Sequence, residues 1–184
     1  MASRRALLAF ALLLPAGALA QRRRAELSID QLFEALKAAP TDEAARAVEA
    51  QIWQAWLQQG SPAVQLLMRR GMRHLQARAL DEALEDFDAV IALAPEVAEG
   101  WNKRATVYFL RGEHENAARD IAETLAREPR HFGALAGLSH VREAQGDPLA
   151  ALRAFEAALA IHPRLAGGEE RLKKLRRKAL GEGI

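Results

Sequence analysis

The sequence predicts an all-α fold, a right-handed α-solenoid of about three and a half helix pairs with one further helix capping its C-terminal end. Three observations support this fold class. An alanine, a large apolar residue and a proline return in three sets, each 34 residues after the one before. Half of the 184 residues are apolar, which suits helices that bury one face. A unit of this length cannot cover its own apolar face, so the units must stack. The three sets are Ala83, Phe87 and Pro95, then Ala117, Ile121 and Pro129, then Ala151, Phe155 and Pro163.

The first twenty residues have the pattern of a secretory signal peptide. Arg4 and Arg5 precede the apolar run 6–14, and the small residues of 18–20 mark a cleavage site. We therefore expect segment 1–20 to be removed and the protein to be periplasmic. The alternative is an uncleaved anchor in the inner membrane, although the run is shorter than the ~20 apolar residues of a spanning helix. Arginines at 22–24 favour that alternative, because positive charge after the cleavage site hinders translocation.

Charge and cysteine content exclude several classes of function. The chain has 26 basic and 24 acidic residues, and two of the basic ones fall in the signal segment, so the mature chain is close to neutral. Nucleic-acid binding normally needs a concentrated basic surface, so we expect no nucleic-acid partner. The chain has no cysteine, which excludes disulfides, thiolate metal sites, a cysteine nucleophile and attachment as a lipoprotein.

Segment 21–63 is expected to form a pair of helices. Ser28 and Gln31 have the spacing of a capping box, which predicts a helix from there to about residue 39. Pro40 ends this helix, and Thr41 is suited to cap a second one.

Trp53 and Trp56 lie on the second helix of this pair. Such aromatic pairs are more often core than ligand cage, because each ring can bury ~150–250 Å² against the next unit. We interpret both as core residues of a degenerate first repeat, with a ligand cage as the alternative.

Three repeat units follow at 64–97, 98–131 and 132–165. The first helix of each carries a large apolar residue and, four positions later, a small residue that lets the neighbouring helix approach closely. These pairs are Leu67 and Gly71, Trp101 and Ala105, and Leu135 and Ser139.

The turns inside the units carry residues that end and restart helices. Gly112 and Gly146 suit the left-handed conformation that follows a helix. Asp147 can cap the next helix, with Pro148 at its first position.

The repeats resemble the tetratricopeptide repeat (TPR) family, and the second unit matches that pattern most closely. The first and third units depart from it, with His74 and Arg142 in place of the tyrosine. Arg70 and Arg104 stand where leucine is usual, and we expect their stems on the surface with the charge in water. The matching residues of the second unit are Trp101, Ala105, Tyr108, Ala117 and Pro129, with Ile121 in place of the phenylalanine.

Segment 166–184 is expected to form a basic capping helix. Leu172, Leu175 and Ala179 fall on one helical face, which can close the last apolar face of the stack. Weak contact with an anionic membrane surface is the alternative, because the remaining residues are largely basic.

The resemblance implies that the first helices line a concave groove. Methionine adapts its shape to varied partners, so we expect the groove to hold a segment of another protein; packing against neighbouring helices is the alternative. Chaperone-type members of the family clamp a terminal carboxylate at such positions, but two of these are methionine here, so that specificity is not expected. The candidate groove residues are Met68, Met72 and Leu75 in the first unit, Asn102, Thr106 and Phe109 in the second, and Ala136, His140 and Glu143 in the third.

The sequence shows no pattern typical of catalysis or of cofactor binding. No two of the five histidines have the one-turn spacing of metal-binding helices. His140 and Glu143 lie one turn apart, but no nucleophile or oxyanion hole accompanies them, so a surface hydrogen bond is the better interpretation. We therefore expect no enzyme activity, no metal and no cofactor.

These observations predict a protein-interaction scaffold or adaptor of the cell envelope. The alternative function is that of a membrane-surface protein, held by an uncleaved N-terminal segment or by the basic C-terminal helix. The sequence leaves the partner and the oligomeric state open.

Overall fold

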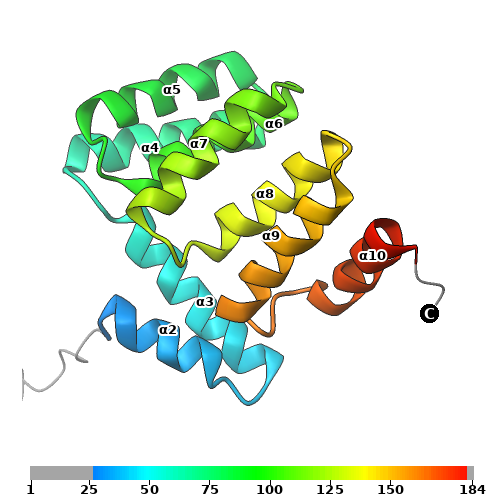
Figure 1. The fold of residues 1–184 in the computed structure, drawn as a ribbon. Helices are drawn as coiled ribbons and strands as arrows, with labels where there is room; N and C mark the ends of the chain where they lie inside the picture. Colours follow the sequence, from blue (N-terminus) through cyan, green and yellow to red (C-terminus); the bar gives the residue numbers. More distant parts are fainter. Residues whose placement is uncertain (1–26, 182–184) are drawn as a thin grey trace, which may run out of the picture.

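The computed structural model describes residues 27–181, which form nine α-helices and contain no strand. The predicted signal segment 1–20 lies outside the described residues. Figure 1 shows the helices in chain order. They are α2 (Ile29–Lys37), α3 (Asp42–Leu57), α4 (Pro62–Gln76), α5 (Leu80–Leu93), α6 (Ala98–Leu110), α7 (His114–Arg127), α8 (Phe132–Ala144), α9 (Pro148–Ile161) and α10 (Gly168–Leu180).

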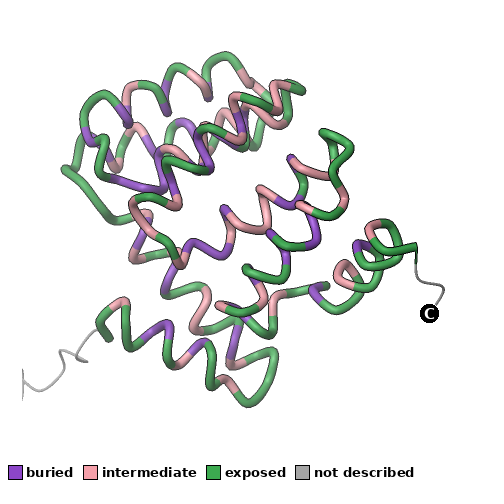
Figure 2. The backbone as a smooth tube through the Cα atoms, viewed as in Figure 1, coloured by how far each residue is buried: buried purple, intermediate pink, exposed green. Residues whose placement is uncertain are grey.

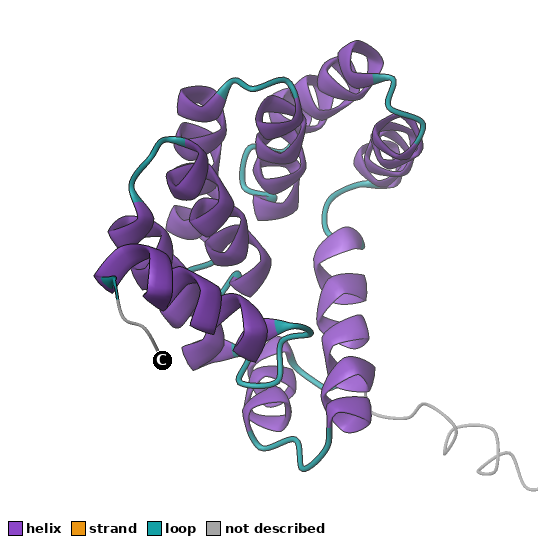
Figure 3. Cartoon of the chain, turned by 90° about the vertical axis from the view of Figure 1, so that its right-hand side faces the viewer, coloured by secondary structure: helices purple, strands orange, loops and turns teal. Residues whose placement is uncertain are grey.

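Three helix pairs form a stack: α4 with α5, α6 with α7, and α8 with α9. Each second helix also contacts the first helix of the following unit, so α5 packs on α6 and α7 on α8. Figures 1 and 3 show the pairs following one another, with α10 beside α9 at the end. The predicted all-α repeat architecture is therefore confirmed.

Small residues on the first helices allow the close packing that the sequence predicts. A Cβ added at Gly71 would lie only 2.7 Å from the Phe87 ring. Ala105 and Ser139, at the equivalent positions, are buried as well. Figure 2 shows buried residues recurring along the stacked helices, as expected when each unit completes the core of its neighbour.

The predicted helix starts are present. Ser28 and Gln31 form both hydrogen bonds of a capping box. The Thr41 side chain accepts from the backbone N–H of Ala44, and Asp147 accepts from that of Ala150. These side chains satisfy N–H groups that have no partner within the helix.

The turns inside the units are left-handed, as the glycines predict. Gly112 and Gly146 have φ of +77° and +79°. The first unit has Arg78 at this place, with φ of +62°. A side chain is disfavoured in this conformation, so the first turn is strained where the other two are not.

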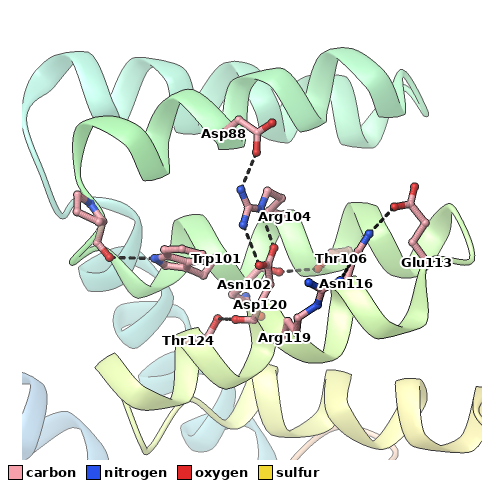
Figure 4. A network of polar contacts seen from close by, with 11 residues as sticks. Asp88, Trp101, Asn102, Arg104, Thr106, Glu113, Asn116, Arg119, Asp120 and Thr124 are labelled. Atoms are coloured by element: carbon pink, nitrogen blue, oxygen red, sulfur yellow. Dashed lines mark hydrogen bonds and ion pairs between the residues drawn. The ribbon is translucent and has the colours of Figure 1, made fainter.

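The expectation that the charge stays in water is wrong for Arg104, whose side chain is 18 % exposed, whereas the Arg70 side chain is 52 % exposed, as expected. Arg104 donates from Nε and Nη2 to the two carboxylate oxygens of Asp120, at 2.7 and 2.8 Å, and from Nη1 to Asp88 at 2.7 Å (Figure 4). Arg70 also pairs with an aspartate, Asp86, but both of its contacts are to Oδ1, and His74 Nδ1 lies 2.9 Å from Oδ2. Asp86 and Asp120 are buried on the second helices, and a buried carboxylate requires a partner.

The N-terminal pair α2–α3 does not stack on α4–α5 as a degenerate repeat. It packs instead against α6 and α9 and against the turns that precede α8 and follow α9. Arg130 donates to Asp30 at 2.8 Å, and Arg164 donates to the Ala39 carbonyl oxygen at 2.8 Å, so the contacts join residues 100 and 125 positions apart. We refer to residues 29–57 as the N-terminal hairpin.

An aromatic cluster explains this position of the hairpin. The Trp56 ring is buried and stacks on the buried His131 ring, at 4.1 Å between centroids and 9° between planes. Trp53 and Trp56 also contact Phe132 edge-on or at a tilt. Trp56 is thus a core residue and Trp53 packs beside it partly buried, but their partners His131 and Phe132 lie at the junction of the second and third units rather than in the first.

Helix α10 closes the last pair. Leu175 is fully buried against Ala151 and Phe155, and Leu172 and Ala179 pack beside it. Several basic side chains of α10 are paired within the chain, because Lys173, Arg176 and Lys178 contact glutamates. Among the described helices, none has the length and apolar character needed to cross a membrane.

Candidate partner-binding groove

A hollow of about 170 Å³ lies between α6 and α8. Four of the predicted groove residues line it: Asn102, Thr106 and Phe109 from α6, and His140 from α8. Its other lining residues are mostly apolar or glycine. They are Ala105, Ile121, Gly133, Gly137 and Val141. Predicted groove residues from the first helices of two different units therefore line one hollow.

Hydrogen bonds hold the polar residues of this hollow. Asn102 donates from Nδ2 to Glu99 at 3.0 Å, and the Thr106 hydroxyl donates to the Asn102 carbonyl oxygen at 3.0 Å. Phe109 and His140 face each other with 6.3 Å between ring centroids. Desolvation lowers the pKa of the His140 imidazole, and the nearby Arg171 charge lowers it further. The neutral ring keeps this part of the hollow uncharged at neutral pH.

Gly133 and Gly137 were missed by the sequence analysis. They lie one turn apart on α8, and a Cβ at Gly137 would meet only Ile121, at 3.7 Å. Each glycine costs a helix about 1 kcal/mol relative to alanine. Gly133 allows the close approach of the Trp53 ring, and Gly137 leaves room in the hollow.

The first-unit residues do not join this hollow. Met72 and Leu75 line a separate and wider hollow of about 560 Å³ between α4 and α6, together with Arg69, Arg73 and Lys103. Met68 is only 2 % exposed and packs in the core with Phe87, so its prediction as a groove residue is wrong. Met68 lies one helical turn after the buried Val64, so its side chain faces α5.

The third-unit residues Ala136 and Glu143 also lie elsewhere. Ala136 packs against the cluster between α9 and α10. Glu143 accepts hydrogen bonds from Lys178 at 3.0 Å and Arg171 at 3.3 Å, and the Lys178 bond contributes most to lowering the pKa of this carboxyl. Glu143 thus attaches helix α10 to α8.

A buried polar junction connects the hollows to the N-terminal hairpin. The fully buried Glu99 carboxylate lies 2.9 Å from Lys103 Nζ and 2.9 Å from His131 Nε2. His131 Nδ1 accepts from the backbone N–H of Ala134, so the proton on Nε2 is the one that points at Glu99. Burial alone raises the pKa of a carboxyl, but Lys103 and His131 outweigh it and leave the pKa of Glu99 lowered.

Trp53 contacts one lining residue of each hollow. A Cβ at Gly133 would be 2.5 Å from the Trp53 ring, and Lys103 Nζ lies 5.1 Å from the centre of that ring. Gly133 lines one hollow and Lys103 the other, so Trp53 of the hairpin supports a lining residue of each.

The chemistry of the described residues is that of a binding surface. Within 27–181, no group of three or more histidine, aspartate or glutamate side chains could hold a metal ion. The hollow between α6 and α8 is lined by one amide (Asn102), one hydroxyl (Thr106) and two aromatic rings (Phe109 and His140). Stacked helix pairs with a hollow between their first helices define the class of helical-repeat proteins.

Comparison with known proteins gives the family within this class. No protein-family model matches the chain. It is 35% identical over 153 residues to a TPR repeat-containing protein of Rhizobium etli, a match that covers 83% of this chain and 75% of that relative. The chain therefore belongs to the TPR repeat family.

Solved structures share the fold at low sequence identity. The first TPR of Spaghetti (RPAP3), bound to an HSP90 peptide, has a TM-score of 0.63 at 20% identity and covers 67% of this chain and 97% of that one. MamA has a TM-score of 0.57 at 19% identity, covering 76% of this chain and 83% of its own.

Proposed function

We propose that this protein is an interaction scaffold or adaptor of the cell envelope, and that it holds a segment of a partner protein in the hollow between α6 and α8. The observation that carries the proposal is the convergence of Asn102, Thr106, Phe109 and His140 on one mostly apolar hollow. Fixed polar groups around an apolar hollow are what peptide recognition requires.

The fold relatives support a peptide as the ligand. The RPAP3 domain was solved with an HSP90 peptide, and the TPR2B domain of yeast Sti1 with an Hsp70 peptide. The hollow of this chain has its own lining residues. We therefore expect it to bind a peptide segment, as those domains do, but not the same peptide sequence.

The location follows from the sequence pattern of residues 1–20. With that segment acting as a signal peptide, the adaptor works in the periplasm; with the segment retained, the same groove is held at the inner membrane. Membrane fractionation distinguishes the two, because only the retained form pellets with membranes in high salt.

A groove-filling variant tests the function. Gly137→Leu places a side chain in the hollow, where its Cβ meets Ile121 at an ordinary contact distance. We expect this variant to lose at least ten-fold in capture of the partner from an envelope extract, measured by quantitative mass spectrometry. Ten-fold corresponds to about 1.4 kcal/mol of binding free energy.

The matched control is Ala122→Leu, which adds the same side chain at an exposed position of α7. It should capture the same partner as the unmodified chain. Met68 is unsuitable for this test because a polar residue in the core would unfold the protein. Unchanged capture by a folded Gly137→Leu variant would refute the proposed groove.

A further inference from the structure

The first unit has an uncovered stacking face. The N-terminal hairpin packs near α8 and α9 and reaches the core of the first unit with Leu57 at the end of α3. No described helix therefore runs along α4 and α5 where the later units have a preceding second helix. Leu66 on α4 and Leu93 on α5 are 57 % and 62 % exposed, the highest values among the large apolar residues that the structure describes.

Comparison of equivalent positions shows what this face cannot accept. Val107 and Val141 are buried against the preceding pair in the second and third units. The residue 34 positions before Val107 is Arg73, which is exposed. A further repeat stacked in the same way would bury the Arg73 charge in an apolar contact, so another repeat of this kind does not fit.

The charges on the face form a self-complementary pattern. Leu66 and Arg73 lie two helical turns apart on one side of α4, and Glu82 and Leu93 lie three turns apart on one side of α5. The helices are antiparallel neighbours, as the Arg70–Asp86 pair shows. The two leucines therefore lie at one end of the face, and Arg73 and Glu82 lie at the other.

We propose that this face binds the same face of a second copy, about a two-fold axis parallel to α4 and α5. Such an axis places α4 of one copy over α5 of the other at the same height. Leu66 then meets Leu93 of the other copy, and Arg73 meets Glu82 of the other copy, with both contacts made twice. An isologous interface requires this kind of self-complementarity.

The size of the face sets the strength of the pairing. Two helices of this length, each about 21 Å long and about 10 Å wide, cover roughly 400 Å² in each copy. Stable complexes bury about 800 Å² in each partner, so we expect a weak and reversible dimer.

Sedimentation velocity of the purified chain between roughly 10 and 500 µM tests the proposal, because a Kd in this range gives a concentration-dependent shift from monomer to dimer. Leu66→Glu and Arg73→Glu should each raise the Kd at least ten-fold. The double variant Arg73→Glu with Glu82→Arg reverses both charges and should restore the Kd to within about three-fold of the unmodified chain.

Leu149→Glu is the control, since Leu149 is a 44 % exposed leucine on α9, far from this face in the chain. It should leave the pairing unchanged, and circular dichroism verifies that every variant is folded. The proposal is overturned by a monomer at the highest concentration, by normal pairing of Leu66→Glu, or by a folded double variant that does not recover.

Discussion

At the scale of single residues, the three internal turns show how one side chain can store strain. Gly112 and Gly146 occupy the left-handed region, and Arg78 occupies it in the first unit. The turn geometry is set by the helices on both sides, so the residue adapts to the turn and not the reverse. For a residue with a side chain this conformation costs about 1–2 kcal/mol.

Replacing Arg78 by glycine is therefore expected to stabilise the protein. The relief of strain exceeds the added flexibility of the unfolded chain, so we expect the free energy of unfolding in urea to rise by about 0.5–1 kcal/mol. Gly112→Ala is the reciprocal change: its Cβ would meet no atom within 4 Å, so its cost of about 1 kcal/mol comes from the backbone alone. Equal stability of all three proteins would contradict this account.

At the scale of elements, the N-terminal hairpin connects parts of the stack that are distant in sequence. Trp56 packs between Phe33 of its own pair and His131 and Phe132 at the junction of the second and third units. The hairpin contributes little to the first unit, although only a short connection separates it from α4. Its stability should therefore depend on the third unit rather than on its neighbour in the chain.

Trp56→Ala tests this dependence. Removal of a buried tryptophan costs about 3–5 kcal/mol. In hydrogen exchange we expect faster exchange in α2, α3 and the start of α8, while α4 and α5 keep their protection. Trp101→Ala, at a half-buried ring on α6, serves as the comparison and should leave α2 and α3 protected. Loss of protection in α4 and α5 before α8 would contradict the contacts described above.

The repeat stack could be predicted from the sequence because its contacts recur at a fixed interval, and each set of residues repeats the same argument. The hairpin could not, because the contacts of Trp56 and Arg130 occur once and join distant segments. The pairing of Arg70 with Asp86 and of Arg104 with Asp120 was missed, although the same sixteen-residue separation recurs in both units. For the groove, equivalent repeat positions predicted that the three α6 residues lie together, and they line one hollow. The same positions could not show that the Met68 side chain faces the core.

At the scale of the whole molecule, Glu99 is the point where three parts meet. Its carboxylate contacts Lys103 of its own helix and His131 at the end of its own unit, and Trp53 and Trp56 of the hairpin cover those two partners. The buried carboxylate is hydrogen-bonded to Asn102 and His131 and forms an ion pair with Lys103. Its disruption is strongly destabilising, because its loss leaves Lys103 beside an aromatic ring without its counter-charge. The shape of the groove therefore depends on the ionised form of one side chain.

Glu99→Gln is expected to destabilise the protein in a pH-dependent way. The glutamine still accepts from His131, but its amide cannot pair with Lys103, so we expect a loss of about 3 kcal/mol at pH 7 in urea unfolding. The pKa of Glu99 is lowered in the folded state, so its stabilisation is complete above the ordinary glutamate pKa of about 4.3 and is lost as the pH falls through the lower folded value. The difference between the two proteins should therefore shrink as the pH is lowered from 5 toward about 3.

Glu96→Gln, an exposed neighbour, should change stability by less than about 0.5 kcal/mol throughout. A Glu99→Gln deficit that stays constant over the whole pH range would show that shape, and not charge, is what this junction requires.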